Sequence, residues 1–177
     1  MAEANAWAEY VNQIVDKYNW DTMECLHKKE VDEAAIFGLD GTGWYWSPGF
    51  PDINNVTQVT VEGMTDADTQ THNINEFDCI LGASEGKRNP TPAGIRIGGL
   101  KYMLINHDPA TGLAQLTCKG GGAAVMKINT CIVVALFTKE KQCLENDGTP
   151  KPKTFQSSGG CAEQVKTMGD YLKDQGF

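Results

Sequence analysis

The sequence predicts an α+β fold in which residues 1–177 form one domain. We expect a central antiparallel β-sheet with the N- and C-terminal helices packed together on one face. Three observations support this: apolar residues recur at helical spacing near each end of the chain, and strand-like segments joined by short turns fill residues 94–138. Two amphipathic helices that flank a sheet bury their apolar stripes most simply against the same face.

The first helix is predicted from Trp7 to about Tyr18. Trp7, Tyr10, Val11 and Ile14 follow helical spacing, with polar residues opposite them. Trp7 and Tyr10 are three residues apart and therefore lie one turn apart on the same side.

Two short strands are predicted in "EAAIFGLDGTGWYWS", around the hairpin signal "LDGT". Strict alternation places Trp44 and Trp46 on one face of the second strand and Tyr45 on the other. The polar segment "VTQVTVEGMTDADTQTHNI" still alternates, so we expect an inserted hairpin arm at about residues 55–76. "GASEGKRNPTPAG" is predicted to be a loop because it is rich in glycine and proline.

The most strand-like region predicts a four-stranded antiparallel meander. Its segments are "GIRIGGLKYMLINHD", "LAQLTCK", "AAVMKIN" and "TCIVVALFT". The polar residues 141–158 that follow are predicted to form a long mobile loop, a second insertion.

The closing helix is predicted over about residues 161–174. Val165, Met168 and Leu172 lie on one side of it, together with the cysteine that begins the segment. Gly176 is a plausible helix stop because glycine adopts the left-handed conformation that often follows a helix.

The composition excludes several classes of function. A net charge of −8 and a pI near 4.8 argue against nucleic-acid binding and against a broad surface for anionic membranes. The N-terminal residues lack the pattern of a signal peptide, and no apolar run reaches the ~20 residues that span a bilayer, so a cytoplasmic location is expected. All six cysteines are therefore expected to be reduced.

No catalytic or metal-binding pattern is found. His27, His72 and His107 are scattered over polar segments, without a neighbouring nucleophile motif. "GASEGKR" does not have the spacing of a phosphate loop, "KGGGAA" is not a dinucleotide fingerprint, and "ECLH" has no second ligand pair. We predict no enzyme activity, no cofactor and no metal site.

Five aromatic residues allow two interpretations: Trp7, Tyr10, Trp44, Tyr171 and Phe177 are either core residues or the walls of a binding groove. The apolar side of the last helix is already supplied by other residues, which leaves Tyr171 at its border and Phe177 beyond it. If the terminal helices are neighbours, these aromatics line a shallow groove suited to a polyproline II segment. Indole N–H and phenol O–H groups would then bond the proline carbonyls.

These segments resemble the profilin family, small proteins that bind actin monomers. "AWAEYVNQIV" is similar to the N-terminal helix of profilins and "AAIFGLDGTGWYW" to their first hairpin. "GIRIGGLKYMLI" and "GGGAAVMKINTCIVVALF" resemble the later strands, and "MGDYLKDQGF" resembles the ending of plant and many protist profilins. The inserted arm resembles that of apicomplexan profilins, which suggests a protist type, whereas residues 141–158 have no counterpart.

The resemblance assigns poly-proline binding to Trp7, Tyr10, Trp44, Tyr171 and Phe177, with Trp46 as the competing choice for Trp44. It assigns actin binding to a second set of positions: Lys101, Lys119, Gly159 and Lys166. Basic residues are scarce in the corresponding loops, so phosphoinositide binding is expected to be weak at most.

The resemblance implies a monomer that binds monomeric actin and proline-rich assembly factors such as formins, in the cytoplasm and in association with the cytoskeleton. Two alternatives stay open. One is a profilin-like adaptor that binds proline-rich partners without actin, because residues 141–158 obstruct the actin face. The other is a small-ligand sensor domain of similar outline, which would contain an internal cavity.

Overall fold

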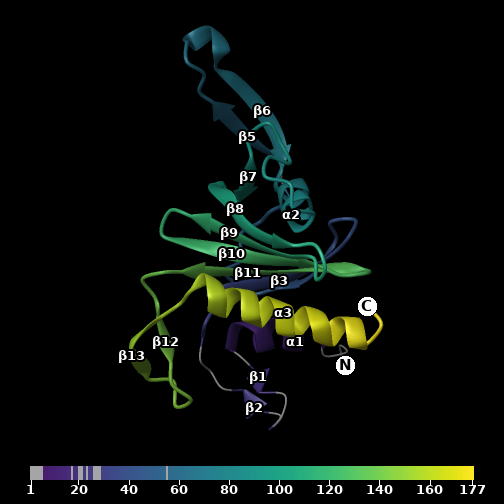
Figure 1. Ribbon diagram of the computed structural model, residues 1–177, viewed down its shortest axis with the longest axis vertical. Coiled ribbons are helices and arrows are strands. Elements are labelled where there is room, and N and C mark those ends of the chain that lie inside the picture. The colour runs from purple at the N-terminus through teal and green to yellow at the C-terminus, as the bar shows by residue number, and fades with distance from the viewer. Residues whose placement is uncertain (1–5, 17, 20–21, 23, 26–28, 55) are drawn as a thin grey trace.

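The computed structural model describes residues 6–16, 18–19, 22, 24–25, 29–54 and 56–177. Its centre is a seven-stranded antiparallel sheet (Figure 1). The strands lie in the order β4 (Gly43–Trp46), β3 (Glu33–Gly38), β11 (Cys131–Thr138), β10 (Gly121–Lys127), β9 (Leu113–Cys118), β8 (Leu100–Asp108) and β7 (Ile95–Ile97).

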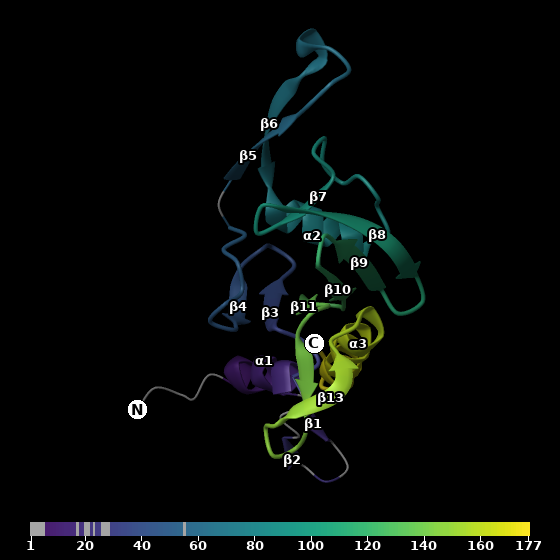
Figure 2. The same ribbon diagram turned by 90° about the vertical axis from the view of Figure 1, so that its left-hand side faces the viewer.

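The two terminal helices, α1 (Ala6–Asp16) and α3 (Ser158–Asp174), lie on the same face of this sheet, as both views show (Figures 1 and 2). Val11 and Ile14 of α1 join one apolar cluster with Met168 and Leu172 of α3, and all four are at most 2% exposed. The predicted α+β fold class is confirmed. Helix α1 ends at Asp16, earlier than predicted.

A third helix, α2 (Glu76–Ser84), covers the opposite face of the sheet (Figure 2). This helix was not predicted, and its last residues were assigned to a loop. The side chain of Asn75 caps its first turn by accepting a hydrogen bond from the Phe77 amide, and Phe77 and Ile80 pack into the core of that face. Nine residues after a polar arm are too few to display clear helical periodicity.

The predicted four-stranded meander is divided into five strands. Gly98 and Gly99, with φ of 60° and 78°, break the first segment into β7 and β8. The carboxylate of Glu76, which is 1% exposed, accepts hydrogen bonds from the amides of both glycines, at 2.5 and 2.7 Å. A buried acid of α2 therefore fixes the turn from which β8 begins.

Two hairpins project from this body. The strands β5 (Val56–Val61) and β6 (Gln70–Asn75) pair over the span where the sequence predicts an arm, and a short 3-10 turn, η1 (Asp66–Asp68), lies near its tip (Figure 1). Residues 141–158 were predicted to be a mobile loop, but they form the hairpin β12 (Gln142–Leu144) and β13 (Pro150–Phe155), followed by the start of α3. A third, two-residue pairing joins β1 (Tyr18–Asn19) and β2 (Glu24–Cys25).

The described helices include none that is long and apolar enough to cross a membrane. Five cysteines are free thiols: Cys79, Cys118, Cys131, Cys143 and Cys161. The side chain of Cys25 and all of His27 lie outside the described residues.

Candidate functional site

The aromatic pair of α1 lies at the border of the helix, where its apolar side meets solvent. Trp7 and Tyr10 are both half-buried, and their rings meet edge to face at 5.7 Å between centroids. Both side chains pack at the edge of the cluster formed by α1, α3 and the sheet. They are therefore partly core and partly available to a ligand.

Trp44 reaches this pair because the β3–β4 hairpin contains a β-bulge. Ile36 pairs with Tyr45 but Phe37 pairs with Gly43, which leaves Trp44 as the extra residue. The bulge turns Trp44 to the side of the terminal helices, where its ring lies 4.4 Å from that of Trp7. The prediction that Trp44 and Trp46 share a face was wrong, because it assumed strict alternation through the bulge.

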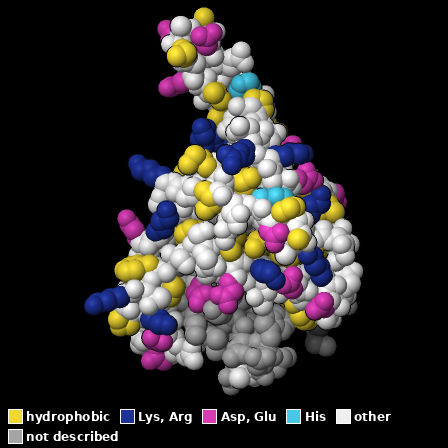
Figure 3. All heavy atoms as spheres, in the orientation of Figure 1, with side chains coloured by type: hydrophobic (Ala, Val, Ile, Leu, Met, Phe, Trp, Pro, Cys, Tyr) yellow, Lys and Arg dark blue, Asp and Glu magenta, His cyan; other side chains and the backbone are white. Residues whose placement is uncertain are grey.

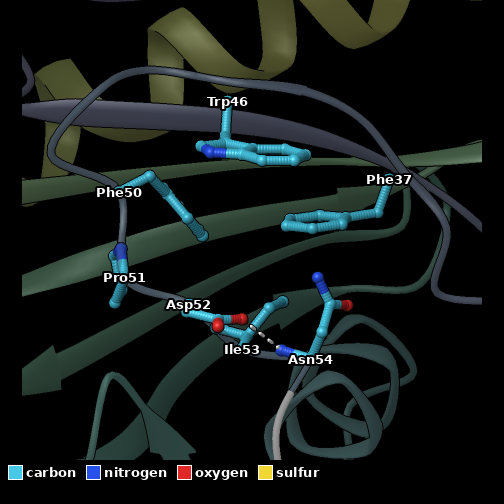
Figure 4. Close-up of a pocket in the computed structure, with 7 residues that line it drawn as sticks. All are labelled: Phe37, Trp46, Phe50, Pro51, Asp52, Ile53 and Asn54. Atoms are coloured by element: carbon cyan, nitrogen blue, oxygen red, sulfur yellow. Dashed lines mark hydrogen bonds between the residues drawn. The ribbon is translucent and has the colours of Figure 1, made fainter.

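Trp46 lies on the other face of β4 and lines a separate pocket of about 370 Å³ (Figure 4). In the close-up its indole lies above Phe37 and Phe50, with Asp52 and Asn54 on the opposite side. Of these two tryptophans, Trp44 is the one whose ring contacts Trp7 and Phe177 among the described residues.

The C-terminus is held in place by a Schellman motif. The amide of Phe177 donates to the carbonyl of Leu172, and the amide of Gly176 donates to the carbonyl of Lys173, both at 3.0 Å. Gly176 has φ of 90°, which glycine adopts without strain. The resulting turn brings the Phe177 ring to 5.0 Å from that of Trp7.

Tyr171 connects α3 to α1 on the same side. Its ring lies 5.6 Å from that of Tyr10. A hydrogen bond between the two hydroxyl groups, more than burial, raises the pKa of Tyr10. The structure thus brings together five half-buried side chains, here called the aromatic cluster: Trp7, Tyr10, Trp44, Tyr171 and Phe177.

The aromatic cluster offers flat apolar faces together with polar groups at their rims. Such surfaces suit a ligand that lacks backbone donors but retains carbonyl acceptors, since indole N–H and phenol O–H groups can donate to those carbonyls. A polyproline II segment has this chemistry.

The four positions assigned to actin binding are exposed or partly exposed, and three lie toward one end of the sheet. Lys101 pairs with Arg96 in the β7–β8 hairpin, and both line a pocket beside Thr60 of the inserted arm. Lys119 lies in the β9–β10 turn and Gly159 at the start of α3. The fourth, Lys166, lies on the outer side of α3 and donates to Asp170.

The strand β8 carries three exposed apolar side chains that were not predicted: Leu100, Met103 and Ile105. Met103 is 61% and Ile105 is 54% exposed, beside the buried Tyr102. Their alternation with Tyr102 and Leu104 in "KYMLI" is the signal that could have identified them. In Figure 3 hydrophobic and basic side chains are interspersed over the part of this face that carries β7 and β8.

In the described part of the chain, no group of three His, Cys, Asp or Glu residues could hold a metal ion. His107 is engaged with the Ser84 carbonyl at 3.0 Å, and His72 lies on the arm. The fold and its surfaces define a small α+β binding domain.

The family model for profilin matches residues 5–177, and the chain belongs to the profilin family. Profilins are a non-enzymatic family that binds actin and polyproline. Solved structures with the same fold include Acanthamoeba castellanii profilin IA, at 22% identity and a TM-score of 0.57, with 97% of this chain and 99% of that chain covered. Schizosaccharomyces pombe profilin matches at 19% identity and a TM-score of 0.54, over 97% of this chain and 99% of that one.

A further match is mouse profilin IIa, solved in complex with a double repeat from the FH1 domain of mDia1. Its identity to this chain is 17%, its TM-score is 0.52, and the match covers 97% of this chain and 99% of that chain. At these identities the three structures establish the fold, and the ligands of this chain have to be argued from its own residues.

Proposed function

We propose that this profilin binds monomeric actin on the face formed by α3 and β8, and proline-rich segments on the aromatic cluster. The observation that carries the proposal is the aromatic cluster itself. Residues from both ends of the chain and from the bulge of β4 meet there, at ring distances of 4.4–5.7 Å along the row from Trp44 through Trp7 and Tyr10 to Tyr171. Aromatic residues that served only as core would be buried, whereas these rings are half-exposed.

The proline-rich ligand would pack its rings between the aromatic side chains, with Trp7 and Tyr10 at the centre of the contact. A shallow surface of this kind buries little area, so we expect dissociation constants on the order of 10 to several hundred micromolar. Formins are the partner class proposed, in line with the FH1 repeat bound to the mouse relative.

The actin monomer would contact the exposed row of β8 and the outer side of α3. Lys101, Lys119 and Lys166 supply charge there, while Met103 and Ile105 supply apolar area. The hairpin β12–β13 lies on the side of α3 away from β8 in both views and therefore does not cover this surface (Figures 1 and 2). That placement favours actin binding over the adaptor that lacks it.

The mechanism needs no covalent chemistry. The protein would act as a monomer in the cytoplasm, hold actin monomers, block their addition at pointed ends and deliver them to proline-rich assembly factors at the cytoskeleton. The sensor-domain alternative expects an internal cavity, whereas the core between the sheet and the terminal helices contains Ile14, Val165 and Leu172, each at most 1% exposed. Phosphoinositide binding is expected to be weak.

A poly-proline column tests the aromatic cluster. Trp7→Ala is expected to abolish retention while the circular dichroism spectrum stays the same, because Trp7 contacts three other members of the cluster. Trp46→Ala is the matched control, since it removes the same side chain from the other face of the sheet. Equal retention of both variants would refute the assignment.

Polymerisation of pyrene-labelled actin tests the second surface. Excess protein is expected to slow spontaneous nucleation, and Lys101→Glu should weaken that effect. If the protein retained poly-proline binding but never slowed nucleation, the adaptor without actin binding would be the correct reading.

A further inference from the structure

The hairpin β12–β13 carries a concentration of basic residues in an acidic chain. Four of the 15 Lys and Arg residues fall within residues 139–153, although the net charge is −8. The strand β13, "PKPKTF", contains two of them and no acid. Of the three acidic residues within residues 139–153, the exposed Glu140 precedes β12, and Glu145 and Asp147 lie at the tip, where Asp147 accepts hydrogen bonds from Thr149.

The hairpin is fixed to the body by a buried polar network. Gln156, which is 5% exposed, accepts a hydrogen bond from the Thr138 amide and donates to the Asp32 carboxylate at 3.1 Å. The same carboxylate accepts from the Thr138 hydroxyl and pairs with Lys141 at 2.9 Å. A segment held in this way presents its side chains in a defined orientation, which lowers the entropy lost when a partner binds.

The hairpin is continuous with the proposed actin surface. The amide of Lys139 donates to the Gly120 carbonyl at 2.9 Å, so the hairpin begins beside the β9–β10 turn that carries Lys119. At its other end β13 runs through Gln156 directly into the first turn of α3, where Gly159 lies. Both ends of the insertion therefore adjoin positions assigned to actin.

The strand β13 presents charge and apolar area to solvent, and Lys153, with φ of 56°, interrupts the regular alternation of its side chains. Phe155 is 49% exposed, and Lys151 and Lys153 precede it. In Figure 3 basic and hydrophobic side chains lie next to one another over this hairpin, at the lower left. Neither lysine has an ion-pair partner among the described residues.

The strand β13 is poorly suited to backbone pairing with a strand of another molecule. Pro150 and Pro152 lack backbone N–H groups, so β13 cannot donate a continuous ladder to another strand. A second copy of the chain would therefore gain little from pairing with it. Contact has to be made through the side chains, whose positive charge selects an acidic surface.

We propose that β13 is an additional contact for the actin monomer, in which Lys151 and Lys153 face an acidic patch of that monomer and Phe155 packs beside it. This inference rests on the proposed actin binding. It assigns a role to the second insertion: it enlarges the actin surface beyond α3 instead of obstructing it.

The test is the affinity of fluorescently labelled monomeric actin for the full chain and its variants. Lys151→Glu combined with Lys153→Glu is expected to weaken binding about three- to tenfold at low salt, and the difference should shrink at about 0.5 M salt as the charges are screened. Phe155→Ala should weaken binding about threefold or more at both salt concentrations. Arg88→Glu, in the loop after α2 on the opposite side of the sheet, is a charge-reversal control for each single variant, Lys151→Glu and Lys153→Glu, and should bind as the unaltered protein does.

The outcomes separate the two proposals. No actin binding by the unaltered protein would refute the proposed function itself. Actin binding that is equal in the β13 variants and Arg88→Glu, or tighter in the β13 variants, would overturn the inference alone. Loss of binding to phosphoinositide vesicles with unchanged actin affinity would also overturn it and would assign the lysines to a membrane. Retention on poly-proline verifies that each variant is folded.

Discussion

Replacing the terminal phenylalanine is the sharpest probe of the aromatic cluster. Phe177→Ala removes a ring that lies 5.0 Å from Trp7 and 6.4 Å from Trp44. Each aromatic pair contributes about 0.5–1.5 kcal/mol beyond its buried area. Because Phe177 is half-buried and lies at the chain end, we take the lower part of that range for each contact, about 1–1.5 kcal/mol together.

The loss should appear in ligand binding more than in folding. If Phe177 both faces the proline-rich ligand and orients Trp7, about 1–1.5 kcal/mol corresponds to an affinity that is weaker by about five- to twelvefold. The same loss from a domain of this size lowers the melting temperature by only about 2–6 °C. The buried face of α3, which includes Met168 and Leu172, is untouched.

Tryptophan fluorescence, titrated with a proline-rich peptide, measures the affinity, and thermal unfolding measures the stability. Phe155→Ala is the control: it is the same substitution at the opposite end of α3, where the ring is 49% exposed. An affinity of Phe177→Ala within a factor of about two of the control would refute the reasoning, because two aromatic contacts would then contribute nothing to the ligand surface.

Three further predictions concern buried or paired ionisable groups. Hydrogen bonds from Lys127, and then from Lys87, hold the pKa of Glu85 at about 2, so its stabilising effect is present above pH 4.5 and is lost as the pH falls toward about 2. The melting temperatures of the protein and of Glu85→Gln should therefore converge over that interval, and parallel curves would contradict the ion pairs. Glu76→Gln should lower the free energy of unfolding in urea by about 1–3 kcal/mol, since an amide cannot replace both carboxylate acceptors at the β7–β8 turn; an unchanged midpoint would contradict this. Burial raises the pKa of Cys131 to about 12, so iodoacetamide should modify it only after unfolding, as mass spectrometry would reveal; rapid modification of the folded protein would show that this thiol is accessible.

The parts of the fold that are periodic over many residues could be predicted from the sequence. Helices α1 and α3 display their apolar spacing over three or more turns, and the strands from β8 to β11 alternate between short turns. Helix α2 has only nine residues, most of them buried, so its pattern lacks a polar side. Periodicity is informative only where one side of an element faces solvent.

The aromatic cluster illustrates a second limit. Trp7, Tyr10 and Tyr171 follow from helical spacing, because a helix has one regular geometry. The orientation of Trp44 depends on a single bulged residue, and a bulge leaves no unambiguous mark on the sequence. Gly38 is one residue that is consistent with this orientation of Trp44. A Cβ on Gly38 would lie 3.1 Å from the Trp44 indole nitrogen, so glycine leaves room for the ring.

The β12–β13 hairpin was predicted as a loop because its composition is polar. Its order comes from a few long-range hydrogen bonds, chiefly those that join Gln156 to Asp32 and Thr138. These partners are 124 and 18 residues away from Gln156 along the chain, so a pattern of neighbouring residues cannot predict the hydrogen bonds between them. Polarity predicts exposure of a segment, whereas the pairing of its buried amide groups decides whether it is ordered.

The two proposed surfaces are set apart by one rigid element. Helix α3 has 17 residues and therefore spans about 25 Å, with Gly159 in its first turn and Tyr171 in its last. A ligand on the aromatic cluster and a partner at the start of α3 can thus be bound at the same time without competing for side chains. In the proposed arrangement β13 extends the actin surface further from the aromatic cluster, so the second insertion would strengthen actin binding without affecting the proline-rich ligand. A coupler requires this independence: if occupancy of one surface lowered the affinity of the other, the protein would release actin when it reached its assembly factor, before the monomer could be transferred.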